Sequence, residues 1–148
     1  MNPYETIDIS GDAGIRASGA TLPELFINAA LGMYSLITDL DGIEEKKGLD
    51  ISVEGGSGEG LLVSWLNELI FHFDTYGFIG KKMTVHEFTP SDEEFQTGRT
   101  FNLRASLAGE EFDPERHEGK LLIKAATYHN LRIEKAGDVW KADVIFDI

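Results

Sequence analysis

Two stretches of helical periodicity, set among segments that alternate apolar and polar residues, constrain the fold of this chain most strongly. The first opens with Thr21 to Glu24, a capping box that has a proline just inside the helix start. This helix is expected to end near Thr38, and its apolar stripe comprises Leu22, Leu25, Phe26, Ala29, Met33, Leu36 and Ile37. The second helix is expected to follow Ser57 and to run to about Phe73. Its stripe comprises Leu61, Leu62, Trp65, Leu66, Leu69, Ile70 and Phe73.

Most of the remaining chain predicts strands. Phe101 to Leu107 and Trp140 to Phe146 alternate in the way that is typical of antiparallel strands with one solvated face. Two more strands, Leu121 to Tyr128 and Leu131 to Lys135, are expected to be joined by a tight turn at His129-Asn130. Shorter strands are expected near residues 4–9, 14–17, 49–53 and 82–88. The elements together predict an α+β fold, a single two-layer domain over residues 1–148, with two helices on one face of mainly antiparallel sheet.

Composition limits the possible partners and compartments. The 148 residues carry 26 acidic and 13 basic side chains, a formal net charge of −13. Because nucleic acid rewards basic surfaces, tight direct binding to RNA or DNA is disfavoured, and a basic protein or metal ions suit this charge better. There is no cysteine, no apolar run that could span a membrane and no secretory signal at the N-terminus. A cytoplasmic location without a membrane partner is therefore expected.

The chain end is the most unusual local feature. An apolar strand runs through Val144 to Phe146 and stops at Asp147 and the terminal Ile148. Chain ends usually fray, whereas this one is expected to lie within the fold. The Asp147 side chain and the free α-carboxylate of Ile148 then place two anionic groups side by side, as Ca²⁺ or Mg²⁺ requires. The simpler interpretation, favoured by these residues alone, is a core strand with a solvated acid.

A second group of acids lies near the N-terminus. Asp8 and Asp12 flank a glycine-containing turn, where Asp12 can present a carboxylate to a ligand or bond its own backbone. The latter is the commoner role for an aspartate in a turn. Thr38 to Gly42 resembles the start of a calcium loop but lacks the later bidentate glutamate, so it predicts an acidic turn that ends the first helix.

Two further segments concentrate polar chemistry. In Phe112 to Glu118, Arg116 can pair with a neighbouring acid and His117 can serve as a base or ligand, although a self-paired surface loop explains the segment equally well. In the second segment, Lys124 and Tyr128 share a predicted strand face, with His129 just beyond, which suits an anion or a partner carboxylate. A lysine extended over a wet sheet face is an equal alternative.

The sequence lacks the common catalytic motifs. It has no glycine-rich phosphate loop, no His-Glu-x-x-His motif and no Gly-x-Ser-x-Gly elbow. Its four histidines have no metal-ligand spacing, and no nucleophile is paired with a base. A non-enzymatic role is therefore expected.

Taken in order along nearly the whole chain, a set of short segments resembles the archease family. Each segment is weak alone, but their order, their spacing and the shared chain end make the combination specific. The segments are Asp12-Ala-Gly-Ile15, Thr21-Leu-Pro-Glu-Leu-Phe26, Asn28-Ala-Ala-Leu-Gly32, Thr38-Asp-Leu-Asp41, Leu61-Leu-Val-Ser-Trp-Leu-Asn-Glu-Leu69, Phe73-Asp74, Phe112-Asp-Pro-Glu-Arg-His-Glu118, Lys124-Ala-Ala-Thr-Tyr-His129 and Val144-Ile-Phe-Asp-Ile148.

The resemblance implies a small protein cofactor of an RNA ligase. That ligase joins a 2′,3′-cyclic or 3′-phosphate RNA end to a 5′-hydroxyl in tRNA splicing and RNA repair. It takes guanylate from GTP onto a histidine, with divalent metal. An archease promotes this activation and permits multiple turnover through a metal held at an acidic site.

Carried onto this sequence, the resemblance implies a cation site formed by Asp12, Asp147 and the Ile148 carboxylate. Ca²⁺ is the first candidate and Mg²⁺ or Mn²⁺ the alternatives. The residues expected to support these ligands or to contact the partner are Asp8, Arg116, His117, Lys124, Tyr128 and His129. One departure is that the family's usual Asp-His-Thr-Ala-Asp is Asp8-Ile-Ser-Gly-Asp12 here, so Ile9 replaces a histidine. An all-oxygen site suits Ca²⁺ or Mg²⁺ better than a transition metal.

Two other functions remain open from the sequence. One is a protein-modulating chaperone for other RNA-processing enzymes, such as methyltransferases, which the acidic surface fits equally well. The other is a metal-dependent hydrolase in which Asp12 and Asp147 hold an ion that activates water.

Overall fold

The computed structural model describes residues 2–148 and contains two long helices. Helix α1 spans Leu22–Ile37, and the Thr21 hydroxyl caps it by accepting a hydrogen bond from the Glu24 N–H at 3.2 Å. Helix α2 spans Gly58–Tyr76 and is capped at its start by Ser57, whose hydroxyl accepts from the Gly60 N–H at 2.9 Å. It ends at Gly77, which has a positive φ of 74° that suits glycine. Both predicted helices are confirmed, and α2 extends one turn beyond the predicted end.

The strands form two separate antiparallel sheets. The first sheet has the order β1-β2-β8-β6, with β7 also paired to β8. Its strands are β1 (Tyr4–Ile9), β2 (Asp12–Gly19), β6 (Ala125–Ala126), β7 (Ile133–Ala136) and β8 (Val139–Asp147). The second sheet has the order β3-β5-β4, formed by β3 (Lys47–Gly55), β4 (Phe78–Thr89) and β5 (Phe101–Glu111). Short 3₁₀ helices occur at Leu40–Gly42 and Asp92–Glu94.

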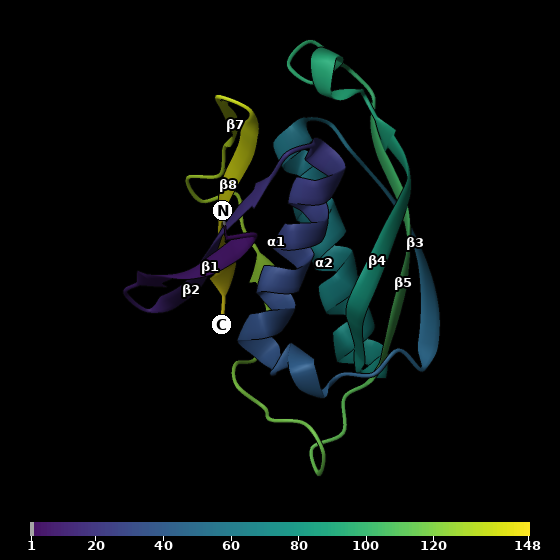
Figure 1. Ribbon diagram of the computed structural model, residues 1–148. Coiled ribbons are helices and arrows are strands. Elements are labelled where there is room, and N and C mark those ends of the chain that lie inside the picture. Colours follow the sequence, from purple (N-terminus) through teal and green to yellow (C-terminus); the bar gives the residue numbers. More distant parts are fainter. Residues whose placement is uncertain (1) are drawn as a thin grey trace.

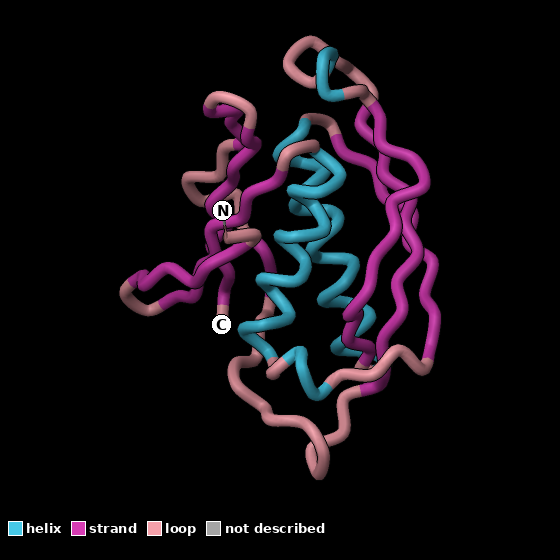
Figure 2. Tube along the Cα trace, in the orientation of Figure 1, coloured by secondary structure: helices cyan, strands magenta, loops and turns pink. Residues whose placement is uncertain are grey.

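The helices lie between the two sheets, as Figure 1 shows and as the separation of helix and strand colours in Figure 2 makes clear. The α+β class and the antiparallel strands are confirmed, but the expected two-layer arrangement is corrected to three layers. The reason is visible in α1, where every residue of the predicted stripe is buried and so are Ala30 and Tyr34, outside it. A helix buried on more than one side needs a covering layer on each side. Trp65 of α2 joins the helices by donating a hydrogen bond to the Phe26 carbonyl at 3.0 Å.

The predicted hairpin of residues 121–135 is wrong. The chain does turn near Asn130, which has a positive φ of 53°, but β6 and β7 do not pair with each other. Instead, both pair antiparallel with β8, β6 beside Phe146 and Asp147 and β7 beside residues 139–142. They are two pieces of one interrupted edge strand, because both follow β8 in the same direction.

The last strand is central in its sheet, so the chain end lies within the fold, as the sequence predicted. Strand β8 pairs with β2 on one side and with β6 and β7 on the other. Val144 and Phe146 are fully buried against the helices. In the described part of the chain, neither helix combines the length and apolarity that crossing a membrane requires.

Candidate functional site

The register of β2 and β8 brings Asp12 and Asp147 together. The last recorded pair is Ala13 with Phe146, so the next residues along the two strands, Asp12 and Asp147, stand opposite each other. Ala13 and Phe146 are buried on the helix side. Because side chains alternate across a strand, the two aspartates project from the outer face of the sheet, and both are exposed. Opposed residues in a sheet place their Cβ atoms about 5 Å apart.

No ion pair or hydrogen bond among residues 2–148 satisfies either of these two carboxylates. Like charges opposed on a sheet face are destabilising, so the arrangement favours a cation between them. The sequence hypothesis adds the α-carboxylate of Ile148, the residue after Asp147, as a third ligand. Every candidate ligand atom is an oxygen, a donor type that suits Ca²⁺ or Mg²⁺. Among the described side chains, no group of three or more His, Cys, Asp or Glu is placed to hold a metal ion.

Asp8 and Ile9 flank this pair from β1. Ile9 is paired with Asp12, so residue 9, where the resemblance expects histidine, lies directly beside the candidate ligand. Asp8 is paired with Ala13 and therefore points to the opposite face of the strand. Asp8 and Asp12 both line a hollow of about 480 Å³ that is closed on its other side by Leu36 and Leu121.

Lys124 approaches the chain end, and Tyr128 and His129 lie beyond the short strand that follows it. The Lys124 N–H donates to the Asp147 carbonyl at 2.8 Å. Strand β6 comprises only Ala125–Ala126, so the strand predicted over residues 121–128 is shorter than expected, and Lys124 and Tyr128 lie on either side of it. Thr127 still follows β8, since its N–H donates to the Ile145 carbonyl at 3.0 Å. Tyr128 is 62% exposed. It lies near the start of α2, where its hydroxyl is 3.7 Å from the position that a Cβ on Gly60 would occupy.

Arg116 and His117 belong to a different cluster, built around a buried carboxylate. Arg116 forms an ion pair with Glu110 at 3.0 Å, and Glu110 is only 3% exposed. Glu110 also accepts a hydrogen bond from the Glu44 N–H. The side chain of His117 is fully buried, and its Nδ1 accepts from the Asp113 N–H at 2.8 Å. The neutral ring therefore carries its proton on Nε2, which faces Glu110 Oε2 at 3.4 Å, slightly long for a hydrogen bond.

Glu110, Arg116, His117 and the Glu44 N–H form a cluster, called here the Glu110 cluster, whose contacts stabilise the fold. The backbone hydrogen bond from Glu44, reinforced by Arg116, lowers the pKa of Glu110 from 4.5 to about 2. Neither interpretation of the Phe112 to Glu118 loop describes it fully, because Arg116 pairs with Glu110, outside the loop, and His117 is buried. Glu110 itself was missed because it lies three residues beyond the predicted strand of Phe101 to Leu107. The signal available was a carboxylate six residues before Arg116, at the end of an alternating strand.

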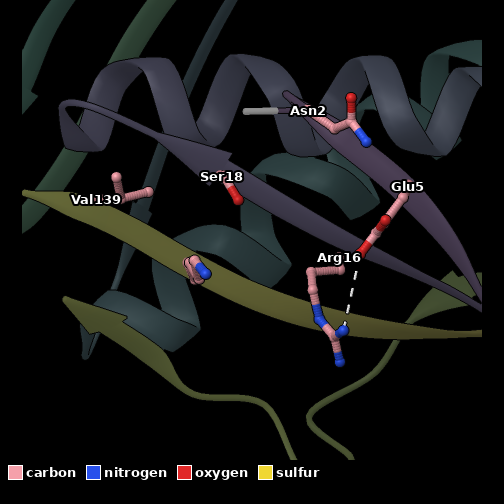
Figure 3. Close-up of a pocket in the computed structure, with 6 residues that line it drawn as sticks. Asn2, Glu5, Arg16, Ser18 and Val139 are labelled. Atoms are coloured by element: carbon pink, nitrogen blue, oxygen red, sulfur yellow. Dashed lines mark ion pairs between the residues drawn. The ribbon is translucent and has the colours of Figure 1, made fainter. Parts of the chain in front are cut away.

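A further hollow opens on the outer face of the first sheet, at the opposite end from Asp12 and Asp147. It is lined by Glu5, Arg16, Ser18 and Lys141, among others (Figure 3). Arg16 is already engaged there by Asp143, through two hydrogen bonds of 2.9 Å, and lies 3.7 Å from Glu5. The hydrogen bonds to Asp143 raise the pKa of Arg16 above its ordinary value. This row of alternating charges stabilises the sheet surface.

Comparison with known proteins identifies the family of this chain. Residues 4–148 match the Archease protein family (MTH1598/TM1083). The chain belongs to the archease family. It is 38% identical over 149 residues to the protein archease of Pyrococcus furiosus, covering all of both chains. Against the protein archease of Methanosarcina acetivorans the identity is 34%, over 98% of this chain and 95% of that one.

Solved structures share the fold. The solution structure of Methanobacterium thermoautotrophicum protein 1598 superposes with a TM-score of 0.80 at 32% identity, over the full length of both chains. An archease from Thermotoga maritima, described as a possible chaperone, has a TM-score of 0.63 at 22% identity, over 97% of this chain and 96% of that one. At that identity the second comparison supports the fold alone.

Proposed function

We propose that this protein is a non-enzymatic cofactor that activates a GTP-dependent RNA ligase joining 3′-phosphate and 5′-hydroxyl ends. Membership of the archease family supports a role as an accessory protein. The observation that carries the proposal is the opposition of the exposed Asp12 and Asp147, which have no ion-pair partner among residues 2–148. Carboxylates buried in ion pairs serve the fold, whereas these two remain available to an external cation.

The role of each residue follows from its position. Asp12 and Asp147 would hold the cation from two adjacent strands, and the Ile148 carboxylate would complete the oxygen set. A bound Ca²⁺, Mg²⁺ or Mn²⁺ would supply positive charge where the partner binds phosphate. Because β8 is paired on both sides, the ligands at its end are held rigidly, as a site that delivers or positions a metal requires.

The protein itself is proposed not to bind GTP, because the sequence lacks a phosphate loop and its charge is −13. Stoichiometric GTP binding by the isolated protein would contradict this part of the proposal. An absence of phosphoester turnover with several divalent metals would likewise separate the cofactor role from that of a metal-dependent hydrolase.

The decisive test is ligation of a 3′-phosphate RNA by the ligase of the same organism, with the ligase limiting. Adding the protein is expected to convert a single turnover into many, and Asp147→Ala is expected to lose that stimulation. Asp138→Ala, an exposed acid in the β7–β8 turn, serves as the matched control. An active ligase that this protein fails to stimulate would overturn the proposal.

A chaperone role for other RNA-processing enzymes is the second candidate. The Thermotoga maritima relative is described as a possible chaperone. Exposed apolar side chains on this chain, including Leu122 and Phe71, suit protein binding. Protection of an unrelated enzyme from aggregation, undiminished by Asp147→Ala, would favour this candidate.

A further inference from the structure

An apolar hollow lies between the C-terminal ends of the two helices. Its floor and walls come from Ile37 of α1, Phe73 of α2, Phe112 and the pair Leu121 and Leu122, and its volume is about 180 Å³. That volume is close to the size of one large apolar side chain. Leu122 is 78% exposed and Leu121 37% exposed, so the rim is open to solvent.

The segment that forms this rim is fixed in place. The Lys120 and Leu121 N–H groups donate to the Ile37 and Leu36 carbonyls, at 2.9 and 3.1 Å. These carbonyls end α1 and have no partners within the helix. On the other side of Leu122, Ile123 is 3% exposed. Leu122 is thus presented to solvent by a chain that is held on both sides, and with the partly exposed Leu121 it forms an open apolar rim.

Aromatic packing fixes the floor of the hollow. The rings of Phe73 and Phe112 meet edge to face, with centroids 6.1 Å apart. Phe112 also packs beside the buried His117 ring at 5.7 Å. The Glu110 cluster therefore supports the hollow from below, and the pocket is formed before any partner binds.

The charge around the hollow is mixed. Lys120 lines it, and its ammonium group lies 3.4 Å from the Ser35 carbonyl. The adjoining hollow, which shares Leu121, is lined by Asp8 and Asp12. A partner that approaches this surface meets a chain whose formal charge is −13.

We propose that this hollow docks a segment of a partner protein that inserts one large apolar side chain flanked by lysine or arginine. The apolar volume selects the inserted side chain, and the acidic chain, with Asp8 and Asp12 in the adjoining hollow, selects its basic neighbours and disfavours nucleic acid. Leu121 also lines the hollow that contains Asp8 and Asp12, so the docking surface continues toward the acidic chain end. The proposal rests on this surface alone and does not require the ligase function.

Peptide binding to the full chain tests the proposal. The probe is a fluorescently labelled amphipathic helical peptide of leucine and lysine, and binding is followed by anisotropy. Two peptides serve as controls, one with glutamate in place of lysine and one with alanine in place of leucine. We expect only the Leu/Lys peptide to bind well.

The matched variants are Leu122→Asp and Val139→Asp. Leu122→Asp is expected to weaken binding about tenfold or more, the size of a contact that dominates an interface. The added charge would by itself attract the basic peptide, so such a loss reports the apolar contact. Val139→Asp adds the same charge at the other end of β8 and should bind like the parent chain. Equal binding by parent and Leu122→Asp, or by the Ala/Lys peptide, would overturn the proposal, and so would a failure of the Leu/Lys peptide to bind.

Because Leu122 is exposed, its replacement should leave the fold intact, which circular dichroism checks. Leu121→Asp provides a second variant on the same rim and should weaken binding in the same direction. Ligation assays play no part in this test, so its failure would leave the proposed ligase function untouched, and the reverse also holds.

Discussion

Two groups of acidic residues in this protein use their charge in opposite ways. At the chain end, Asp12 and Asp147 are exposed, opposed and without partners among residues 2–148. Near the end of β5, Glu110 is 3% exposed, and its carboxylate pairs with Arg116 and accepts a hydrogen bond from the Glu44 N–H. The acids of the first group fall in segments that carry the family resemblance, whereas Glu110 lies outside those segments. The comparison shows that the partners of a carboxylate distinguish one that stabilises the fold from one that stays available to solvent.

The largest expected effect on stability comes from removing the Glu110 carboxylate. Glu110→Ala leaves the Arg116 guanidinium and the Glu44 N–H without their acceptor. We expect the melting temperature to fall on the order of 10 °C. The measurement is thermal unfolding followed by circular dichroism.

The neighbouring Glu111→Ala is the control, because Glu111 is exposed and its only ion pair is a surface contact with Lys47 at 3.4 Å. Its melting temperature should change by about 2 °C or less. Equal effects of the two substitutions would show that the Glu110 cluster does not stabilise the fold.

The second prediction concerns how the stabilisation by Glu110 depends on pH. The folded-state pKa of Glu110 is about 2, below its ordinary 4.5, so its stabilising contribution is complete above pH 4.5 and is lost as the pH falls toward 2. The difference in melting temperature between the parent chain and Glu110→Gln should therefore be constant from pH 7 to about pH 5. It should shrink below that range. A difference that stays constant down to pH 2 would assign the stabilisation to packing and not to charge.

The sequence predicted these two regions unequally, for physical reasons. The caps at Thr21 and Ser57 are local, so both helix starts were correct. The alternation up to the last residues predicted that the chain end lies within the fold, but not that β8 is central in its sheet. Glu110 was missed because burial of a charged side chain depends on Arg116 and Glu44, and the contact with Glu44 spans 66 residues.

Other errors came from pairing that local patterns do not encode. Alternation indicates that a strand has one buried face, but it does not indicate which strand lies beside it. The segments around Ala125 and Ile133 therefore predicted a hairpin, although both pair with β8. For the same reason, one sheet was expected where two enclose the helices. The opposition of Asp12 and Asp147 was a hypothesis from family resemblance, and the strand register gives it a geometric basis.

The third prediction tests whether the exposed pair Asp12 and Asp147 binds Ca²⁺. Ca²⁺ at about 100 times its Kd should stabilise the parent chain by about 2.7 kcal/mol, a rise of several degrees in melting temperature. Asp147→Asn should abolish this rise while leaving the metal-free melting temperature nearly unchanged. Asp138→Asn should keep this rise in melting temperature.

Adding one glycine after Ile148 moves the terminal carboxylate away and should lower the Ca²⁺ affinity, as titration calorimetry would measure. Unaltered affinity in the extended chain would remove Ile148 from the site.

The smallest expected effect comes from restoring an imidazole beside the unsatisfied pair. Residue 9 is paired with Asp12, so Ile9→His places a nitrogen ligand next to the candidate site. We expect affinity for Zn²⁺ or Mn²⁺ to rise about tenfold relative to Ca²⁺, because imidazole suits transition metals better than all-oxygen sites do. Ile7→His is the matched control, since residue 7 lies on the same face of β1 but is paired with Gly14. Calorimetric titration of each variant decides the comparison. An equal gain from both histidines would show that the imidazole acts independently of Asp12, and the metal site would then have to be placed elsewhere.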